Sequence, residues 1–207
     1  MNTSESRGWA LAGPLTIALW IVGFALLTSH QPGDHATGSE ILAWYKAHTD
    51  TILLGGWLFM IGCLGFVTFV AGVGQRLAAP ALALTGAAIA GVSGMLTAAV
   101  DVAGGLDKKD IGPVTAATFH HAVDIFFITA ELAAVLPLAV VAVVAWRTRA
   151  LPRWWAAFSG LVAMVLLIGP IGWIGPIFGL PIWTLGTSLF VLLQRTRVRA
   201  EAAAAAV

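Results

Sequence analysis

Six apolar runs of about 20 residues constrain this chain more than any other feature. A helix of that length crosses a hydrocarbon core of about 30 Å. Hydrophobic residues make up 59% of the 207 residues and charged residues only 10%, against about 25% charged residues in soluble domains. We therefore predict an all-α polytopic membrane bundle of six transmembrane helices, forming a single domain over 1–207. The predicted spans are 9–29, 51–75, 80–104, 121–146, 154–174 and 177–194.

The last two spans are separated by the segment IGPIGWIGPIFGLPIW, which contains three prolines and no charge. A hairpin of two helices and one long broken helix have the same pattern here. Length favours the hairpin, because the 40 residues from Trp154 to Leu193 would extend about 60 Å as one helix, twice the length that one crossing requires.

The arginines predict the orientation, because cytoplasmic loops of membrane proteins carry an excess of Lys and Arg. With six spans, all the positions that carry arginine lie on one side, which we assign to the cytoplasm together with both termini: Arg7, Arg76, Arg147, Arg149, Arg153, Arg195, Arg197 and Arg199. All five histidines fall on the outer side. We expect a multi-pass protein of a bacterial cell membrane, with the lipid bilayer as its surroundings. The net charge of +1 does not indicate nucleic acid.

The first outer loop, SHQPGDHATGSEILAWYKAHTD, contains a helix signal. Thr37 and Glu40 have the spacing of a capping box, and Ile41, Trp44 and Tyr45 follow. We predict a short amphipathic helix at the outer headgroup boundary, with its aromatic residues in the interface. It is equally consistent with a simple anchor and with a lid over a cavity entrance.

Glycines and prolines cluster between the last two spans, at Gly169, Pro170, Gly172, Gly175, Pro176, Gly179 and Pro181. Prolines leave carbonyl groups without helical donors, and membrane depth tolerates this only where those groups face protein or a wet cavity. The cluster therefore predicts a cavity in the outer half of the bundle.

Acidic and histidine side chains fall within or beside the third and fourth spans. Asp101 is close to the outer end of the third span, and the fourth carries His120, His121, Asp124 and Glu131. Spacings of three, four and seven residues place these side chains near one helical face. Glu131, about 16 Å further along the axis than His120, is near the bilayer midplane. An acidic residue at a helix centre costs about 2.5–3.5 kcal/mol on insertion scales, so such residues usually face a bundle interior or act in function.

Three interpretations of these groups remain open. Poor hydration favours the protonated form of a carboxyl group, so one of them could act as a general acid or in a proton relay. The carboxyl groups could instead only hold helices together by hydrogen bonds. A metal site at His120, Asp124 and Asp101 has suitable ligand types, but the adjacent His120 and His121 point about 100° apart on a helix, so only one of them joins a shared site easily.

Aromatic residues point to a lipophilic ligand. Interfacial anchoring accounts for Trp9, Trp146, Trp154 and Trp155. Trp20 and Trp57 are inside spans, Trp173 and Trp183 flank the proline cluster, and Phe127 shares the stripe of Glu131. Indole faces stabilise cations, by about 2 kcal/mol or more when desolvated, although helix packing also explains each Trp taken singly.

Two resemblances follow from these residues. The segment EILAWYKAHTDTILLGGWLF after the first span and the junction RTRALPRWW before the fifth resemble those of uncharacterised small bacterial six-span membrane proteins, which implies the topology and no activity. Paired intramembrane acids beside an aromatic cavity resemble, by chemical analogy only, the integral membrane terpene cyclases. That resemblance implies acid-initiated chemistry on an epoxide or olefin.

We expect an enzyme that cyclises or isomerises a lipophilic isoprenoid substrate by proton transfer, without a cofactor. Asp101 or Asp124 would be the acid, and Glu131 or His121 would orient it or accept a proton. The expected substrate-binding residues are Trp20, Trp57, His120, Phe127, Trp173 and Trp183. The alternatives are a small proton-coupled exporter or lipid-binding protein that uses the same acids, and a structural membrane partner.

Overall fold

The computed structural model describes residues 5–33, 35–168 and 174–204, with side chains between 11 and 193 in these ranges. Its elements are α1 (Glu5–Leu27), α2 (Gly38–Arg76), α3 (Pro80–Leu106), α4 (Pro113–Thr148), α5 (Arg153–Leu166), the π-helical turn η2 (Gly175–Gly179) and α6 (Leu180–Ala204). The described ranges contain no strand. The all-α prediction is therefore confirmed.

Local sequence signals explain where several helices begin and end. The predicted capping box is present at α2: Thr37 accepts a hydrogen bond from the Glu40 amide, and the Glu40 carboxylate accepts one from the Thr37 amide at 2.7 Å. Pro80 and Pro113 open α3 and α4, where a missing N–H has no consequence. Arg149 ends α4 in a left-handed conformation, with φ of 58°.

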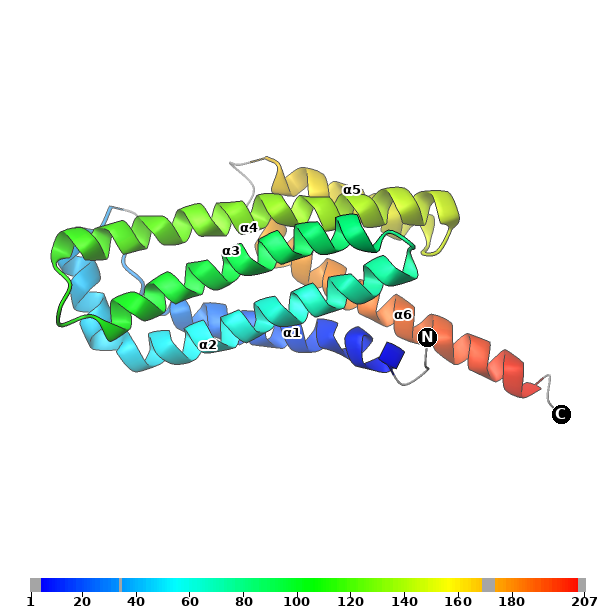
Figure 1. The fold of residues 1–207 in the computed structure, drawn as a ribbon, viewed down its shortest axis with the longest axis horizontal. Coiled ribbons are helices and arrows are strands. Elements are labelled where there is room, and N and C mark those ends of the chain that lie inside the picture. The colour runs from blue at the N-terminus through cyan, green and yellow to red at the C-terminus, as the bar shows by residue number, and fades with distance from the viewer. Residues whose placement is uncertain (1–4, 34, 169–173, 205–207) are drawn as a thin grey trace.

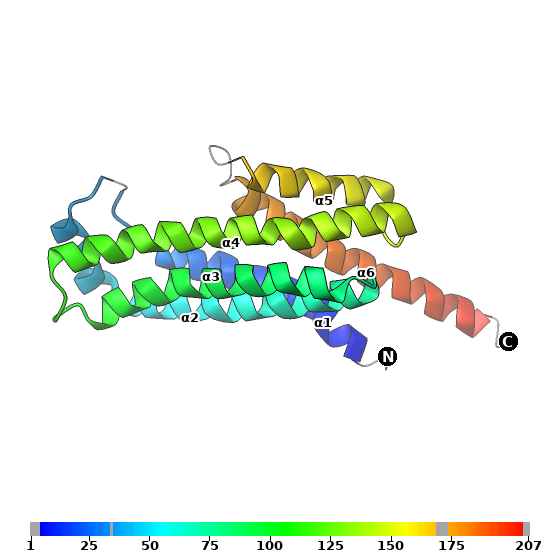
Figure 2. The ribbon, with the colours of Figure 1, turned by 45° about the horizontal axis from the view of Figure 1, so that its top comes forward.

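The long helices α1 to α4 pack in chain order, with α5 against α4 and α6 against α1 (Figures 1 and 2). The first and last helices have their chain-terminal ends at the same end of the bundle, where the α2–α3 and α4–α5 turns also lie. Small residues allow the helices to approach each other closely. A Cβ on Gly86 would come within 2.6 Å of Pro137, and one on Gly23 within 2.6 Å of the Phe59 amide nitrogen.

Four helical segments are long and apolar enough to cross a membrane, namely Gly38–Arg76, Pro80–Leu106, Pro113–Thr148 and Gly175–Leu193. They indicate a membrane protein. The apolar part of α1 is shorter, over Leu11–Leu27.

The hairpin of two helices near the C-terminus is present, but its first arm is shorter than the predicted span 154–174. Helix α5 has 14 residues, or about 21 Å. It lies beside the C-terminal part of α4, and the chain turns back near the middle of α4 (Figures 1 and 2). Residues 169–173, which include Trp173, lie outside the described residues.

The predicted amphipathic helix differs from expectation in its surroundings. Residues 38–47 form the first part of α2 and are not a separate helix. They join the rest of α2 across a kink at His48, whose φ of −119° and ψ of 21° are not helical. Trp44 and Tyr45 are buried in the bundle rather than placed in the interface. Hydrogen bonding explains the burial, since the Trp44 indole donates to the Ser29 carbonyl oxygen at 3.3 Å and the Tyr45 hydroxyl donates to Asp101 at 3.0 Å.

Candidate functional site

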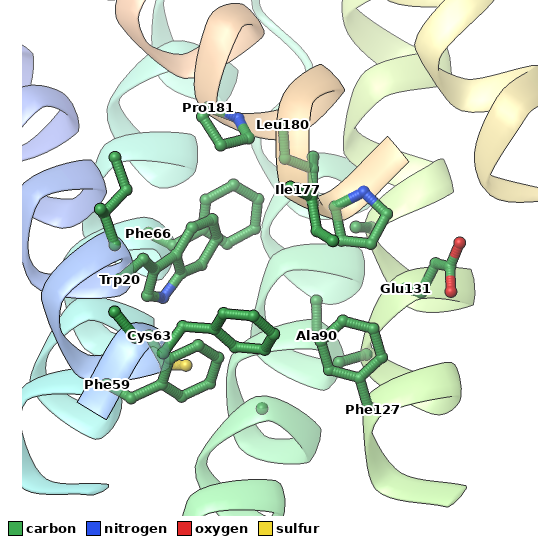
Figure 3. Close-up of a pocket in the computed structure, with 17 residues that line it drawn as sticks. Trp20, Phe59, Cys63, Phe66, Ala90, Phe127, Glu131, Ile177, Leu180 and Pro181 are labelled. Atoms are coloured by element: carbon green, nitrogen blue, oxygen red, sulfur yellow. The ribbon is translucent and has the colours of Figure 1, made fainter. Parts of the chain in front are cut away.

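An apolar cavity of about 300 Å³ lies in the bundle between α1, α2, α3, α4, η2 and the start of α6 (Figure 3). Aromatic rings form much of its wall: Trp20, Phe24, Phe59, Phe66 and Phe127. Pro176 and Pro181, from the predicted glycine and proline cluster, also line it. The cluster therefore marks a cavity, as the sequence indicated.

The cavity is open on the side between α1 and η2. Ile21 and Ile177 line it, and their side chains are 60% and 42% exposed on the outside of the bundle. Between α1 and α4, which both border the cavity, the rings of Phe24 and Phe127 lie with their centroids 6.4 Å apart.

Glu131 is the single ionisable carboxyl group among the cavity-lining residues. It lies midway along the 36 residues of α4. Its Oε1 is buried without a hydrogen-bond partner. Figure 3 shows the carboxyl group at the edge of the cavity, turned away from the aromatic rings. A buried oxygen without a partner costs about 1–3 kcal/mol, so this group is available to a ligand.

Trp20 faces Glu131 from the opposite side of the cavity (Figure 3). Its ring is held by Phe66 and Phe59, with ring centroids at 5.2 Å and 6.2 Å. Gly62 gives the indole its space, since a Cβ there would come within 2.6 Å of Cδ1. The indole Nε1 is buried and has no hydrogen-bond partner. The cavity thus has two unsatisfied polar atoms, on opposite sides.

Asp101 lies away from the cavity, in what we call the outer cluster and define as Tyr45 and Asp101. The Tyr45 hydroxyl donates to Asp101 at 3.0 Å, and both side chains are buried. Gly104 makes room for the Tyr45 ring, which a Cβ would overlap. His120 is also buried, with Nδ1 unpartnered. None of the three lines the cavity.

His121 and Asp124 are exposed on the outer surface of α4 and do not line the cavity. The inward-facing residues of α4 are instead Val123, Phe127, Glu131 and Ala134. At 100° per residue, Asp124 lies at the margin of this arc and His121 beyond it. The predicted common stripe therefore separates into inward-facing and outward-facing parts.

The predicted aromatic residues also separate. Trp20 and Phe127 line the cavity, whereas Trp57 is 61% exposed on the outside of α2. Trp183 is fully buried away from the cavity and donates to Ser159 Oγ at 2.9 Å. Sequence reasoning missed Phe59, Cys63 and Phe66, although their spacing of four and three residues on α2 is that of one helical face.

The described residues contain no group of three or more His, Cys, Asp or Glu side chains that could hold a metal ion. His120 and Asp101 are each buried, and Asp124 is exposed. The metal site left open above therefore has no support from the geometry.

Comparison with known proteins identifies no relative of this chain. The two resemblances drawn from the sequence accordingly remain predictions. No family model, no curated protein and no solved structure matches the chain.

Proposed function

We propose that this protein takes an unsaturated lipophilic molecule, such as an isoprenoid, from the bilayer into the cavity and isomerises or cyclises it by proton transfer from Glu131. The observation that carries the proposal is a carboxyl group with an unpartnered oxygen at the edge of an aromatic cavity. The acid therefore differs from the Asp101 or Asp124 expected from the sequence.

The proposed step needs no cofactor. The protonated carboxyl group, turned toward the ligand about its side-chain bonds, gives its proton to one carbon of a C=C bond. The π electrons form the new C–H bond, and the neighbouring carbon becomes a cation beside a carboxylate. Loss of a proton from an adjacent carbon to that carboxylate, directly or after ring closure, yields an isomer and restores the acid.

The wall of the cavity suits such a cation. Trp20, Phe59 and Phe127 present π-systems, which attract cations more strongly when desolvated. Exclusion of water also protects a carbocation from capture. These properties support the proposed chemistry. They also favour the binding of an apolar carbon chain.

The test is turnover by the protein in nanodiscs, supplied with a panel of prenyl alcohols and prenyl hydrocarbons. We expect products of unchanged mass in H₂O and deuterium incorporation in D₂O. Glu131→Gln should abolish both, whereas Asp124→Asn, which changes an exposed carboxyl group outside the cavity, should keep both. Turnover by Glu131→Gln equal to that of the unmodified protein would refute the mechanism.

A second candidate is a lipid-binding protein or a small proton-coupled exporter. The orientation of the carboxyl group, away from the rings, favours it, because a group that only carries a proton need not contact the ligand carbon. Ligand flux in proteoliposomes that requires a pH gradient and Glu131, without any isomeric product, would select this candidate over the enzyme.

We further propose that the helical bundle lies in a bacterial cell membrane, with both termini in the cytoplasm and with α5, η2 and α6 forming a C-terminal hairpin. The position of both chain ends and of the arginine-bearing turns at one end of the bundle supports this topology. Alkaline phosphatase fusions test it, since the enzyme folds only outside the cytoplasm. Fusions after residues 33 and 110 should be active, and those after residues 76 and 149 inactive.

A further inference from the structure

The two unsatisfied polar atoms of the cavity also define the kind of molecule that fits it. The Trp20 indole can only donate a hydrogen bond, and its Nε1 is buried without an acceptor. The Cys63 thiol is a polar neighbour of the indole and can accept from it, but sulfur is a weak acceptor, so a stronger acceptor remains unsupplied. An oxygen atom of a ligand would supply the missing partner.

The charge of the cavity-lining residues further restricts the class of ligand. Among the residues that the structure describes, those that line the cavity include one acid and no Lys, Arg or His. An anion bound there would lose its hydration without gaining a counter-charge, which is strongly unfavourable. Diphosphates, phosphates and fatty carboxylates are therefore unsuitable ligands, whereas a neutral oxygen is suitable.

Size gives the last restriction. A volume of about 300 Å³ is at the lower end for small-molecule sites. At roughly 30 Å³ for each non-hydrogen atom, the share of a water molecule in the liquid, it holds about ten such atoms. A single short chain or ring system fits, and a phospholipid does not.

We infer that the cavity binds a small neutral lipophilic molecule with one oxygen, an alcohol or a carbonyl compound, that accepts a hydrogen bond from Trp20. This inference rests on the proposed function and deepens it. Because Trp20 and Glu131 are on opposite sides, a ligand whose oxygen is bound at α1 directs the far end of its carbon chain toward α4. The double bond furthest from the oxygen is then the one presented to Glu131.

Three probes with a common carbon skeleton test this inference: geraniol, its deoxygenated analogue 2,6-dimethyl-2,6-octadiene, and geranyl diphosphate. Binding is measured by native mass spectrometry of the protein in nanodiscs, with protein-free nanodiscs to correct for partition into lipid. We expect geraniol to bind about fivefold more tightly than the hydrocarbon, the size of one net hydrogen bond. Geranyl diphosphate should bind at least tenfold more weakly than geraniol.

The variants separate the indole donor from the indole ring. Trp20→Phe keeps an aromatic ring but removes the donor, so its affinities for geraniol and the hydrocarbon should become equal. Trp57→Phe is the matched control, because Trp57 is exposed outside the cavity, and should keep the fivefold preference.

The outcomes distinguish a failure of this inference from a failure of the proposed function. Equal binding of geraniol and the hydrocarbon by the unmodified protein, a preference retained in Trp20→Phe, or tight binding of the diphosphate would overturn the inference and leave a lipophile-binding cavity intact. No binding of either neutral probe would overturn the proposed function as well.

Discussion

The cavity and the outer cluster both contain a carboxyl group within an apolar bundle, but only one of the two side chains is fully buried and satisfied by a hydrogen bond. Asp101 accepts a hydrogen bond from Tyr45 and does not line the cavity. Glu131 Oε1 has no partner and borders an open space. A satisfied buried acid holds helices together, whereas an unsatisfied one beside a cavity is available for a ligand. From the difference between the two acids we propose a functional role for Glu131 and a structural role for Asp101.

The largest expected effect separates the two acids in activity. Glu131→Gln should lower turnover by at least about 100-fold, the lower limit of a general-acid contribution, because the amide cannot supply the proton. Asp101→Asn should retain most of the turnover. Rates of isomer formation on the same substrate measure the turnover of both variants. Equal losses of turnover would contradict the proposed difference between the two acids.

A smaller effect is expected from filling the cavity. Ala130 lines the cavity, so a phenylalanine there should occupy ligand volume and weaken the binding of geraniol about tenfold or more. Ile128→Phe places the same ring on the exposed side of α4 and serves as the control. Similar affinities for the two variants would show that the ligand binds elsewhere.

Tyr45→Phe should affect stability and not activity. The substitution leaves Asp101 buried without its donor, which costs about 1–3 kcal/mol. We expect a lower melting temperature in detergent but unchanged binding of geraniol per folded molecule. A loss of geraniol binding by the folded fraction would show that the outer cluster influences the cavity.

The smallest expected effect is on thermal stability and concerns the indole groups of Trp183 and Trp20. Trp183→Phe removes the hydrogen bond to Ser159 and should cost about 1 kcal/mol of stability. Trp20→Phe removes a donor that has no partner and should cost less. Thermal unfolding of the ligand-free protein compares them, and a greater loss for Trp20→Phe would mean that its indole is already satisfied.

Much of the fold could be predicted from the sequence, because apolar runs and helix caps are local signals. The capping box at Thr37, the C-terminal hairpin and the mid-helix position of Glu131 all depend on residues close together in the chain. The extent of α5 was not predicted, since the apolar pattern continues through 167–174 without a charge to end the helix.

The site was harder to predict, because helical spacing defines a face without defining which face packs inward. Trp57 and Phe59 are about 200° apart around α2, so only one of them can line the cavity. The partner of Asp101 could not be found either, since Tyr45 is 56 residues away along the chain. Both depend on how helices distant in sequence pack together.

The most direct test of the central claim is mass spectrometry of the small molecules that copurify with the protein, compared between the unmodified chain and Ala130→Phe. The cavity proposed for binding should retain a neutral oxygenated lipophile in the unmodified protein and lose it in the variant. The same small molecules in the same amounts from both proteins would contradict the claim that this cavity is the functional site.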